Sequence, residues 1–238
     1  MKRLAILTPL VALATTLIPS SVVFAQPAGD EVLLQMQQAS RKQDIRALTT
    51  LLPAIQGHPL EVWGHYWALK ARLSSATAQE VEDFLQRWRG TYQEDRLRND
   101  WLLLLGQRRN WAEFERLHTE FRMQDDKQLR CYDLAIASIE GRLPQHASTE
   151  LQQLWMGQPA NDDGCTYAAS TLYAAEQLPA LAVWQRARLG AERNQLSTAR
   201  NALTIVAPQH VDALAGLFKS PQAYLSNPKT TPPPALAT

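Results

Sequence analysis

Cys131 and Cys165 are the residues of this chain with the widest choice of chemistry. They can form a disulfide, contribute to a metal site or remain as two separate thiols. Only His146 lies between them, in a C-x14-H-x18-C spacing that matches no zinc-binding pattern, and a metal ion needs further ligands. An oxidising compartment favours a disulfide, which would constrain the unfolded chain by about 3–4 kcal/mol. The compartment is therefore the first question.

The N-terminus has the three parts of a secretory signal peptide. Lys2 and Arg3 form a basic start, residues 4–18 form an apolar run, and Val23 and Ala25 fit the −3 and −1 positions of a cleavage site. The alternative is a membrane anchor, but the apolar run is shorter than the ~20 residues that span a bilayer. We predict a signal peptide over residues 1–25, cleavage after Ala25, and no membrane span after its removal.

Export changes both the length and the charge of the chain. Removing 25 residues from 238 leaves 213, which is enough for one sizeable domain, expected over residues 26–220. Two of the 24 basic residues are lost and all 23 acidic residues stay, so the formal net charge changes from +1 to −1. The absence of a basic surplus argues against nucleic acid or an anionic membrane as a partner. Outside the cytoplasm a Cys131–Cys165 disulfide is favoured, with two free thiols and a metal site as the alternatives.

The other ionisable residues show no catalytic constellation. The five histidines contain no HExxH motif or close pairing, and the chain has no G-x-S-x-G elbow and no glycine-rich phosphate loop. Acidic residues occur in clusters that suit helix caps and solvated helix surfaces better than general acid–base work: Glu80, Glu82 and Asp83, Glu94 and Asp95, Glu113 and Glu115, Asp125 and Asp126. We predict no catalytic residue, no cofactor and no metal, and the substrate-binding residues are unknown at this point.

Tryptophan is over-represented, and these residues are the remaining candidates for a binding function. Helix–helix packing explains seven tryptophans that all lie in apolar helical patterns: Trp63, Trp67, Trp88, Trp101, Trp111, Trp155 and Trp184. A competing hypothesis is that the tryptophan-rich face between Trp63 and Trp88 binds sugar directly, because indole rings stack on sugar rings.

Apolar residues recur with helical spacing throughout, and no segment alternates like a strand between hairpin turns. Boundary signals include Asp44 and Asn110 as caps, Pro59 at a helix start, and the capping box of Thr77 and Glu80. Helical hairpins of roughly 30–40 residues predict an all-α fold, an irregular α-superhelix (solenoid), rather than a closed bundle of fewer, longer helices. Residues 221–238 are proline-rich and predict the interrupted start of a further helical element.

Several segments between residues 30 and 218 resemble the N-terminal superhelical region of the soluble lytic murein transglycosylases of Gram-negative bacteria. One is HPLEVWGHYWALKARL, another is the turn Arg109-Asn110-Trp111, and a third is PALAVWQRARLGAERNQLSTARNAL. The most specific is RCYDLAIASIEG followed by LQQLWMGQPANDDGC, with its Cys-Tyr start and second cysteine. The resemblance implies a periplasmic, U-shaped superhelix that in the complete enzymes carries a lysozyme-like domain, which cleaves peptidoglycan to 1,6-anhydro products.

The family's catalytic motifs do not occur in this chain. No glutamate is followed by serine, and Gly-Leu-Met-Gln and Ala-Tyr-Asn are absent, so no catalytic residue is carried over. We expect a superhelical scaffold that is truncated before the catalytic domain, inactive alone, and associated with peptidoglycan glycan strands or other cell-wall enzymes. The alternative is an autonomous periplasmic adaptor, similar to tetratricopeptide-repeat proteins, that binds protein partners.

Overall fold

A computed structural model describes residues 29–226. Within this range the chain forms thirteen α-helices and three short 3₁₀ helices (η), and no strand. The predicted signal peptide, residues 1–25, and the end of the predicted tail, residues 227–238, lie outside the described residues. The elements, in chain order, are α1 (Gly29–Arg41), α2 (Ile45–Leu51), η1 (Leu52–Ile55), α3 (Glu61–Ala71), η2 (Leu73–Ser75), α4 (Ala78–Arg87), α5 (Tyr92–Gln107), α6 (Trp111–His118), α7 (Lys127–Ile139), α8 (Ala147–Met156), α9 (Asp163–Ala174), α10 (Ala180–Glu192), α11 (Leu196–Val206), η3 (Pro208–His210), α12 (Val211–Lys219) and α13 (Pro221–Leu225).

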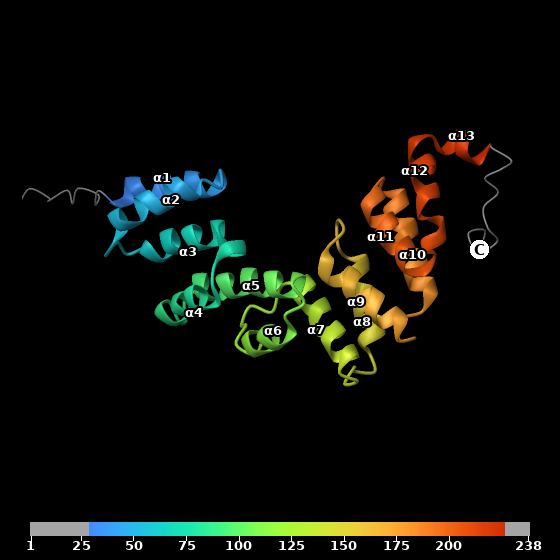
Figure 1. Cartoon of the computed structure of the whole chain (residues 1–238), viewed down its shortest axis with the longest axis horizontal. Coiled ribbons are helices and arrows are strands. Elements are labelled where there is room, and N and C mark those ends of the chain that lie inside the picture. The colour runs from blue at the N-terminus through green and yellow to red at the C-terminus, as the bar shows by residue number, and fades with distance from the viewer. Residues whose placement is uncertain (1–28, 227–238) are drawn as a thin grey trace, which may run out of the picture.

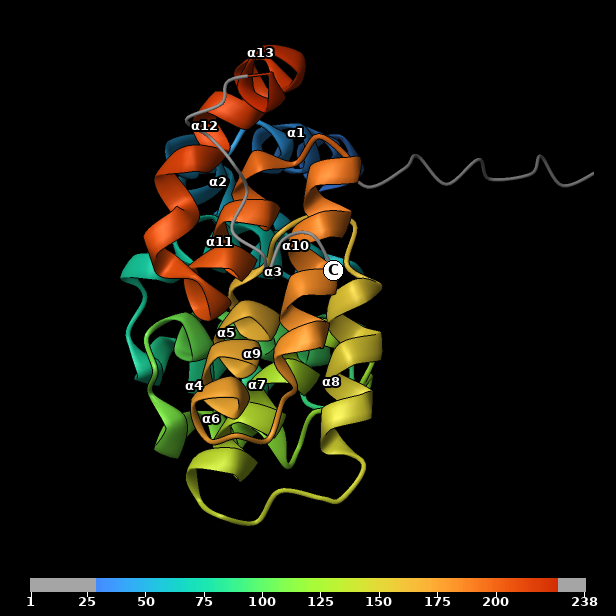
Figure 2. The same ribbon diagram turned by 90° about the vertical axis from the view of Figure 1, so that its right-hand side faces the viewer.

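The helices follow one another along a curved path instead of closing on one centre. Figure 1 shows a U in which α1–α3 form one limb, α10–α13 form the other, and α5–α7 lie at the base. Figure 2 views the same stack along the U, with the red C-terminal helices in front of the blue N-terminal ones. The predicted all-α superhelix of short helical hairpins is confirmed. The first five residues of the predicted tail form α13, which packs on α12.

Three hydrophobic cores follow each other along this path, and adjacent cores share helices. The first joins α1, α2 and α3 around Met36 and Leu48, the second joins α3 to α7 around Leu102, and the third joins α7 to α11 around Trp155. Each of these side chains is essentially inaccessible to water. Burying one side chain of leucine size stabilises the fold by about 1.5–3 kcal/mol. The stack is therefore stabilised between neighbours, as in other solenoids.

Local capping signals are confirmed in part. The Asp44 carboxylate accepts a hydrogen bond from the Ala47 N–H at 2.9 Å, and Thr77 and Glu80 form the predicted capping box of α4. Asn110 precedes α6, but its side chain makes no cap hydrogen bond, so that prediction is wrong in its chemistry. Pro59 lies two residues before the start of α3, in the turn that leads into the helix.

Glycine 106 allows α5 and α7 to meet at the base of the U. A Cβ atom at Gly106 would lie 2.3 Å from the ring of Tyr132, which α7 places directly against the glycine. No side chain fits at that separation without movement of the ring. Gly106 is therefore a packing requirement of the fold.

The carboxylates at the start of α5 correct the expectation that they are solvated. Glu94 is 0% and Asp95 2% exposed. Asp95 accepts hydrogen bonds from the backbone N–H groups of Arg122 and Met123, the latter at 2.8 Å. These bonds hold the loop after α6 against α5. Glu94 accepts from the guanidinium groups of Arg98 at 2.5 Å and Arg122 at 2.6 Å. These partners supply the charge and hydrogen bonds that a buried carboxylate requires.

The two cysteines lie on α7 and α9, two helices that pack closely in the second half of the U. The Cys131 and Cys165 sulfur atoms are bonded at 2.03 Å, with the Cα atoms 4.8 Å apart, and both residues are fully buried. The cysteine pair lies at disulfide distance, as the sequence analysis expects. The bridge joins two segments that the chain separates by the whole of α8.

Candidate functional site

One hollow with an aromatic lining is a groove between α1 and α3, which we call the α1–α3 groove. It has a volume of about 450 Å³, within the range of small-ligand sites. Leucine side chains and two indole rings provide its apolar surface, and α1 contributes polar groups, with the full lining formed by Leu33, Leu34, Gln37, Ser40, Arg41, Leu60, Trp63 and Trp67. Leu34 on α1 is 60% exposed and Leu60, the residue before α3, is 48% exposed, so apolar surface on both sides of the groove faces solvent.

Helical spacing explains how this lining arises. Gln37, Ser40 and Arg41 occupy positions i, i+3 and i+4 of α1 and therefore share one face of that helix. Trp63 and Trp67 are likewise four residues apart on α3. Met36 and Ala39 on the neighbouring face of α1 are buried in the first core, which fixes the orientation of the polar face beside the tryptophans.

Trp63 is the centre of an aromatic cluster that continues from the groove onto α5. Its ring centroid lies 5.7 Å from that of Trp67, 6.0 Å from that of Tyr66 and 6.0 Å from that of Tyr92. Tyr92, the first residue of α5, is 56% exposed. The aromatic surface thus continues from α3 onto α5 through Trp63, and α1 borders it with leucine and polar side chains.

A charged and hydrogen-bonded cluster lies on α3 and α5 beside the aromatic rings. The Tyr66 hydroxyl donates to Asp100 at 2.8 Å, and the Lys70 ammonium donates to Asp100 at 3.0 Å and to Tyr66 at 3.1 Å. Burial and the nearby Asp100 raise the pKa of Tyr66, so the phenol keeps its proton. Burial alone would lower the pKa of Lys70, but its hydrogen bonds to Tyr66 and Asp100 raise it overall. Lys70 is therefore a cation that Asp100 neutralises.

Trp63 and Trp88, which the sugar-binding hypothesis places on one face, lie on two separate surfaces. Trp88 lines a different hollow, together with His65 and side chains of α2 and α4. The Trp88 ring lies 5.7 Å from the imidazole of His65 and 4.7 Å from the guanidinium carbon of Arg87. Because Trp63 and His65 point to opposite sides of α3, only Trp63 and Trp67 belong to the α1–α3 groove.

The histidines and acids with unusual surroundings serve the fold. His58 contacts Asp30 through Nε2 at 2.7 Å and accepts the Leu60 N–H at Nδ1, so both ring nitrogens are engaged. Burial raises the pKa of Asp162, as a general acid requires, but this residue caps α9 by accepting the Cys165 N–H at 2.7 Å. Within residues 29–226 no group of three or more His, Cys, Asp or Glu side chains is placed to hold a metal ion.

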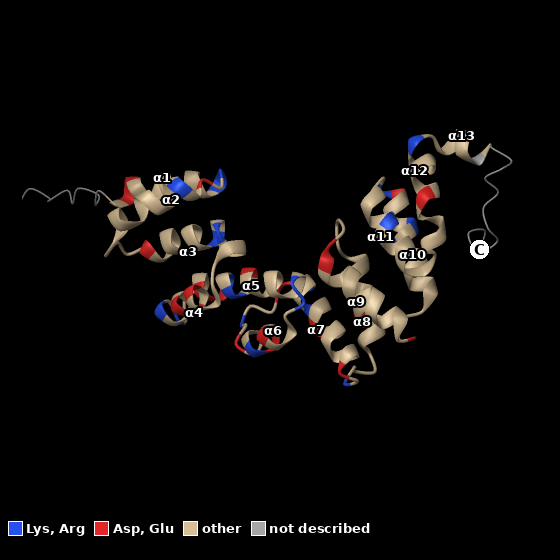
Figure 3. Ribbon diagram, in the orientation of Figure 1, with Lys and Arg blue, Asp and Glu red and all other residues tan. Residues whose placement is uncertain are grey.

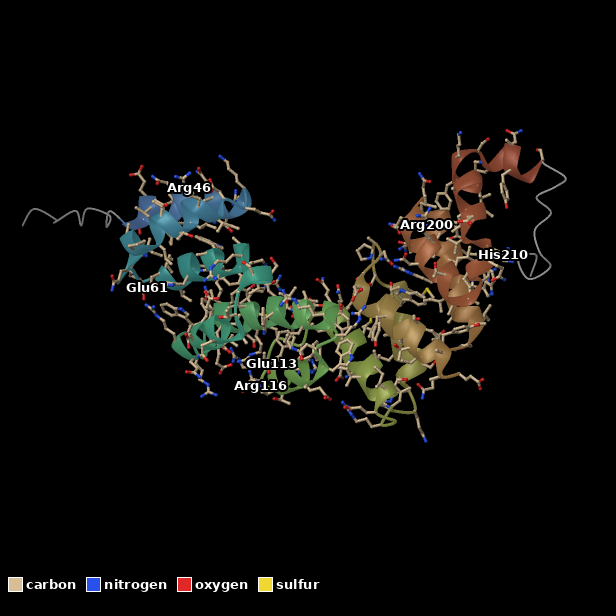
Figure 4. The ribbon with its side chains drawn as sticks, viewed as in Figure 1. Arg46, Glu61, Glu113, Arg116, Arg200 and His210 are labelled. Carbon is tan, nitrogen blue, oxygen red and sulfur yellow. A yellow bond between two sulfur atoms is a disulfide. The ribbon has the colours of Figure 1, made fainter. Side chains whose placement is uncertain are left out.

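Charges of both signs are mixed over the molecule. Figure 3 shows acidic and basic residues side by side on α4, α5 and α6. On the outer side of the base, Glu113 and Arg116 of α6 pair at 2.7 Å, and Figure 4 shows both at the underside of the U. Among the helices of residues 29–226, none combines the length and the apolar character that a membrane crossing requires.

Comparison with known proteins identifies no relative. No protein-family model, no curated protein and no solved structure matches this chain. The geometry of the site is therefore the basis for assigning a function.

Sequence patterns identify only part of this site. Trp63 and Trp67 are recognisable as candidates for sugar binding, whereas Gln37, Ser40 and Arg41 give no such signal, because the pairing of α1 with α3 is a tertiary property. Their i, i+3, i+4 spacing beside a buried methionine is the one local sign that they share a face of the helix that is not part of the core.

Proposed function

We propose that this chain is a periplasmic superhelical scaffold of the soluble lytic transglycosylase type, which binds peptidoglycan glycan strands without cleaving them. The observation that carries the proposal is the open surface across α1, α3 and α5, where indole rings adjoin hydrogen-bonding side chains. Aromatic faces against sugar rings, combined with polar groups at their edge, are what a glycan strand needs for binding. Such a surface can bind a glycan strand but offers no pair of general acid and general base to cleave it.

The superhelix and the cysteine pair also support the proposal. Cys131 and Cys165 lie in the segment with the most specific resemblance to that family, and here they join α7 to α9. A curved stack of helical pairs is also a surface to which a catalytic module or another cell-wall enzyme can dock. We propose that export removes residues 1–25, so that the mature protein starts at Gln26.

Incubation of the mature protein with purified peptidoglycan sacculi tests this function. We expect the protein to sediment with the sacculi and the supernatant to contain no soluble 1,6-anhydro fragments. Release of such fragments would show that the chain is itself an enzyme. Failure to sediment would contradict glycan binding and favour the second candidate, a periplasmic adaptor for proteins, for which the exposed Leu34 and Leu60 offer an apolar contact.

A further inference from the structure

We propose that Arg109 acts as a clamp that fixes the separation of the two limbs of the U, and with it the width of the space between them. The clamp joins the turn between α5 and α6 to the start of α9. It goes beyond the proposed function, because the width between the limbs restricts any partner, whatever the chemistry of that partner.

The two halves of the U meet at α7, because this helix belongs to both the second and the third core. Tyr132 of α7 is part of the second core, and Leu134 is part of the third. The Cys131–Cys165 disulfide joins α7 to α9, so these two helices move together. Figure 1 shows α5 and α6 on one side of α7 and α9 on the other. Side chains that reach from the α5–α6 turn to α9 therefore control the angle between the halves.

The Arg109 side chain forms hydrogen bonds with the ends of both helices. Its guanidinium donates to the two oxygens of the Asp163 carboxylate, at 2.5 and 3.0 Å, across 54 positions of the sequence. It also donates to the carbonyl oxygen of Gly106 at 2.6 Å. Asp163 is the first residue of α9, and Gly106 belongs to the last turn of α5. A bidentate contact between arginine and carboxylate fixes orientation as well as distance, so these two helix ends are held in one geometry.

Aromatic side chains from both halves surround the clamp. The guanidinium carbon of Arg109 lies 4.0 Å from the ring centroid of Tyr167 on α9, which is within cation–π range. Trp111, at the start of α6, packs on the same ring with the centroids 5.4 Å apart. The Tyr132 hydroxyl donates to Asp163 at 2.5 Å and so orients the carboxylate. Burial would raise the pKa of Asp163, but its hydrogen bonds to Arg109 and Tyr132 lower it overall, so the ion pair is charged at neutral pH.

The backbone of Arg109 allows a variant that removes the clamp without straining the turn. Its φ angle is 55°, in the left-handed region that glycine adopts at helix ends with less cost than other residues. Arg109→Gly therefore suits the turn while it deletes the guanidinium. Glu176 has the corresponding position two residues after the end of α9, with a φ of 58° and an exposed side chain. Glu176→Gly is the matched control for the effect of glycine at such a turn.

Pulsed electron spin resonance measures the distance between the limbs directly. Nitroxide labels replace the side chains of Arg46 and Arg200, which are exposed and lie on opposite limbs (Figure 4). A keto amino acid carries each label, so that the native disulfide stays intact. We expect one narrow distance distribution for the labelled protein and a broader distribution with a displaced mean for Arg109→Gly. Glu176→Gly should keep the narrow distribution.

Two further variants distinguish the clamp from other contacts. Asp163→Asn keeps the size of the carboxylate but removes its charge, and it should fold because the side chain is 42% exposed. We expect it to broaden the distribution as Arg109→Gly does. Arg142→Gln removes another ion pair between the halves, from the α7–α8 loop to Glu115 of α6. The Arg142 side chain is 50% exposed, so water screens this pair and the distribution should stay narrow.

Three results would overturn the proposal. One is an unchanged distribution for Arg109→Gly. Another is a broad distribution for Arg109→Gly together with a narrow one for Asp163→Asn, or an equally broad one for Glu176→Gly, because the flexible glycine is then the cause. The third is equal broadening in Arg109→Gly and Arg142→Gln, which would show that ionic contacts in general, and not this clamp, hold the halves together.

Discussion

Replacing Glu94 by glutamine tests whether the buried ionic network holds the base of the U together. The variant keeps the size of the side chain but removes the charge that faces Arg98 at 2.5 Å and Arg122 at 2.6 Å. Breaking a buried ion pair by removing one partner lowers the free energy of unfolding by about 3–5 kcal/mol. Arg98 keeps Glu120 at 3.1 Å, and the Arg122 side chain is 51% exposed, where water screens the pair. We therefore expect the lower end of the range, about 3 kcal/mol.

Urea denaturation followed by far-UV circular dichroism measures this loss. Glu120→Gln is the matched control, because Glu120 pairs with the same Arg98 guanidinium but is 49% exposed. An exposed pair contributes at most about 1 kcal/mol, so the control should unfold close to the wild type. Equal losses for the two variants, or a loss below about 1 kcal/mol for Glu94→Gln, would refute the structural importance assigned to burial.

Three further predictions concern the base of the U and the helices that follow it. Burial raises the pKa of Glu94, but Arg122 and Arg98 lower it below its ordinary value of 4.5 overall. Its stabilisation is therefore complete above about pH 4.5 and is lost as the pH falls toward the folded-state pKa. The difference in urea midpoint between wild type and Glu94→Gln should shrink below that pH, and a constant difference would contradict this. Replacing Cys131 and Cys165 by alanine opens a bridge across a sequence separation of 34 and should cost about 4 kcal/mol in urea denaturation, whereas an unchanged midpoint would show that the bridge contributes nothing. Gly106→Ala should lower the melting temperature, because overpacking against Tyr132 costs about 1–3 kcal/mol, and an unchanged value would mean that the ring moves freely.

Features fixed by short-range spacing can be predicted from the sequence. Asp44, Thr77 and Glu80 cap their helices because the acceptor and the N–H groups lie within three residues of each other. The all-α architecture follows from periodicity in the same way. The disulfide between the two cysteines could be predicted only together with the oxidising compartment that the N-terminus implies.

Features that depend on distant partners were not predictable in this way. Glu94 and Asp95 have the pattern of an acidic first helical turn, which is normally solvated. They are buried because Arg122, 27 or 28 residues further along the chain, returns to cover them. Trp63 and Trp88 share an apolar pattern, yet opposite sides of α3 separate them. In each case the deciding contact is between helices, and a single sequence does not specify which helices meet.

The central claim, that this surface binds glycan, is tested most directly by photo-crosslinking in living cells. A benzophenone amino acid in place of Leu34, which is 60% exposed at the α1–α3 groove, reacts with whatever occupies the groove. In the periplasm of a Gram-negative host, glycan binding predicts a high-mass adduct that disappears on digestion with lysozyme. An adduct that resists lysozyme and is degraded by protease to a peptide of another protein would contradict the claim and identify a protein as the ligand.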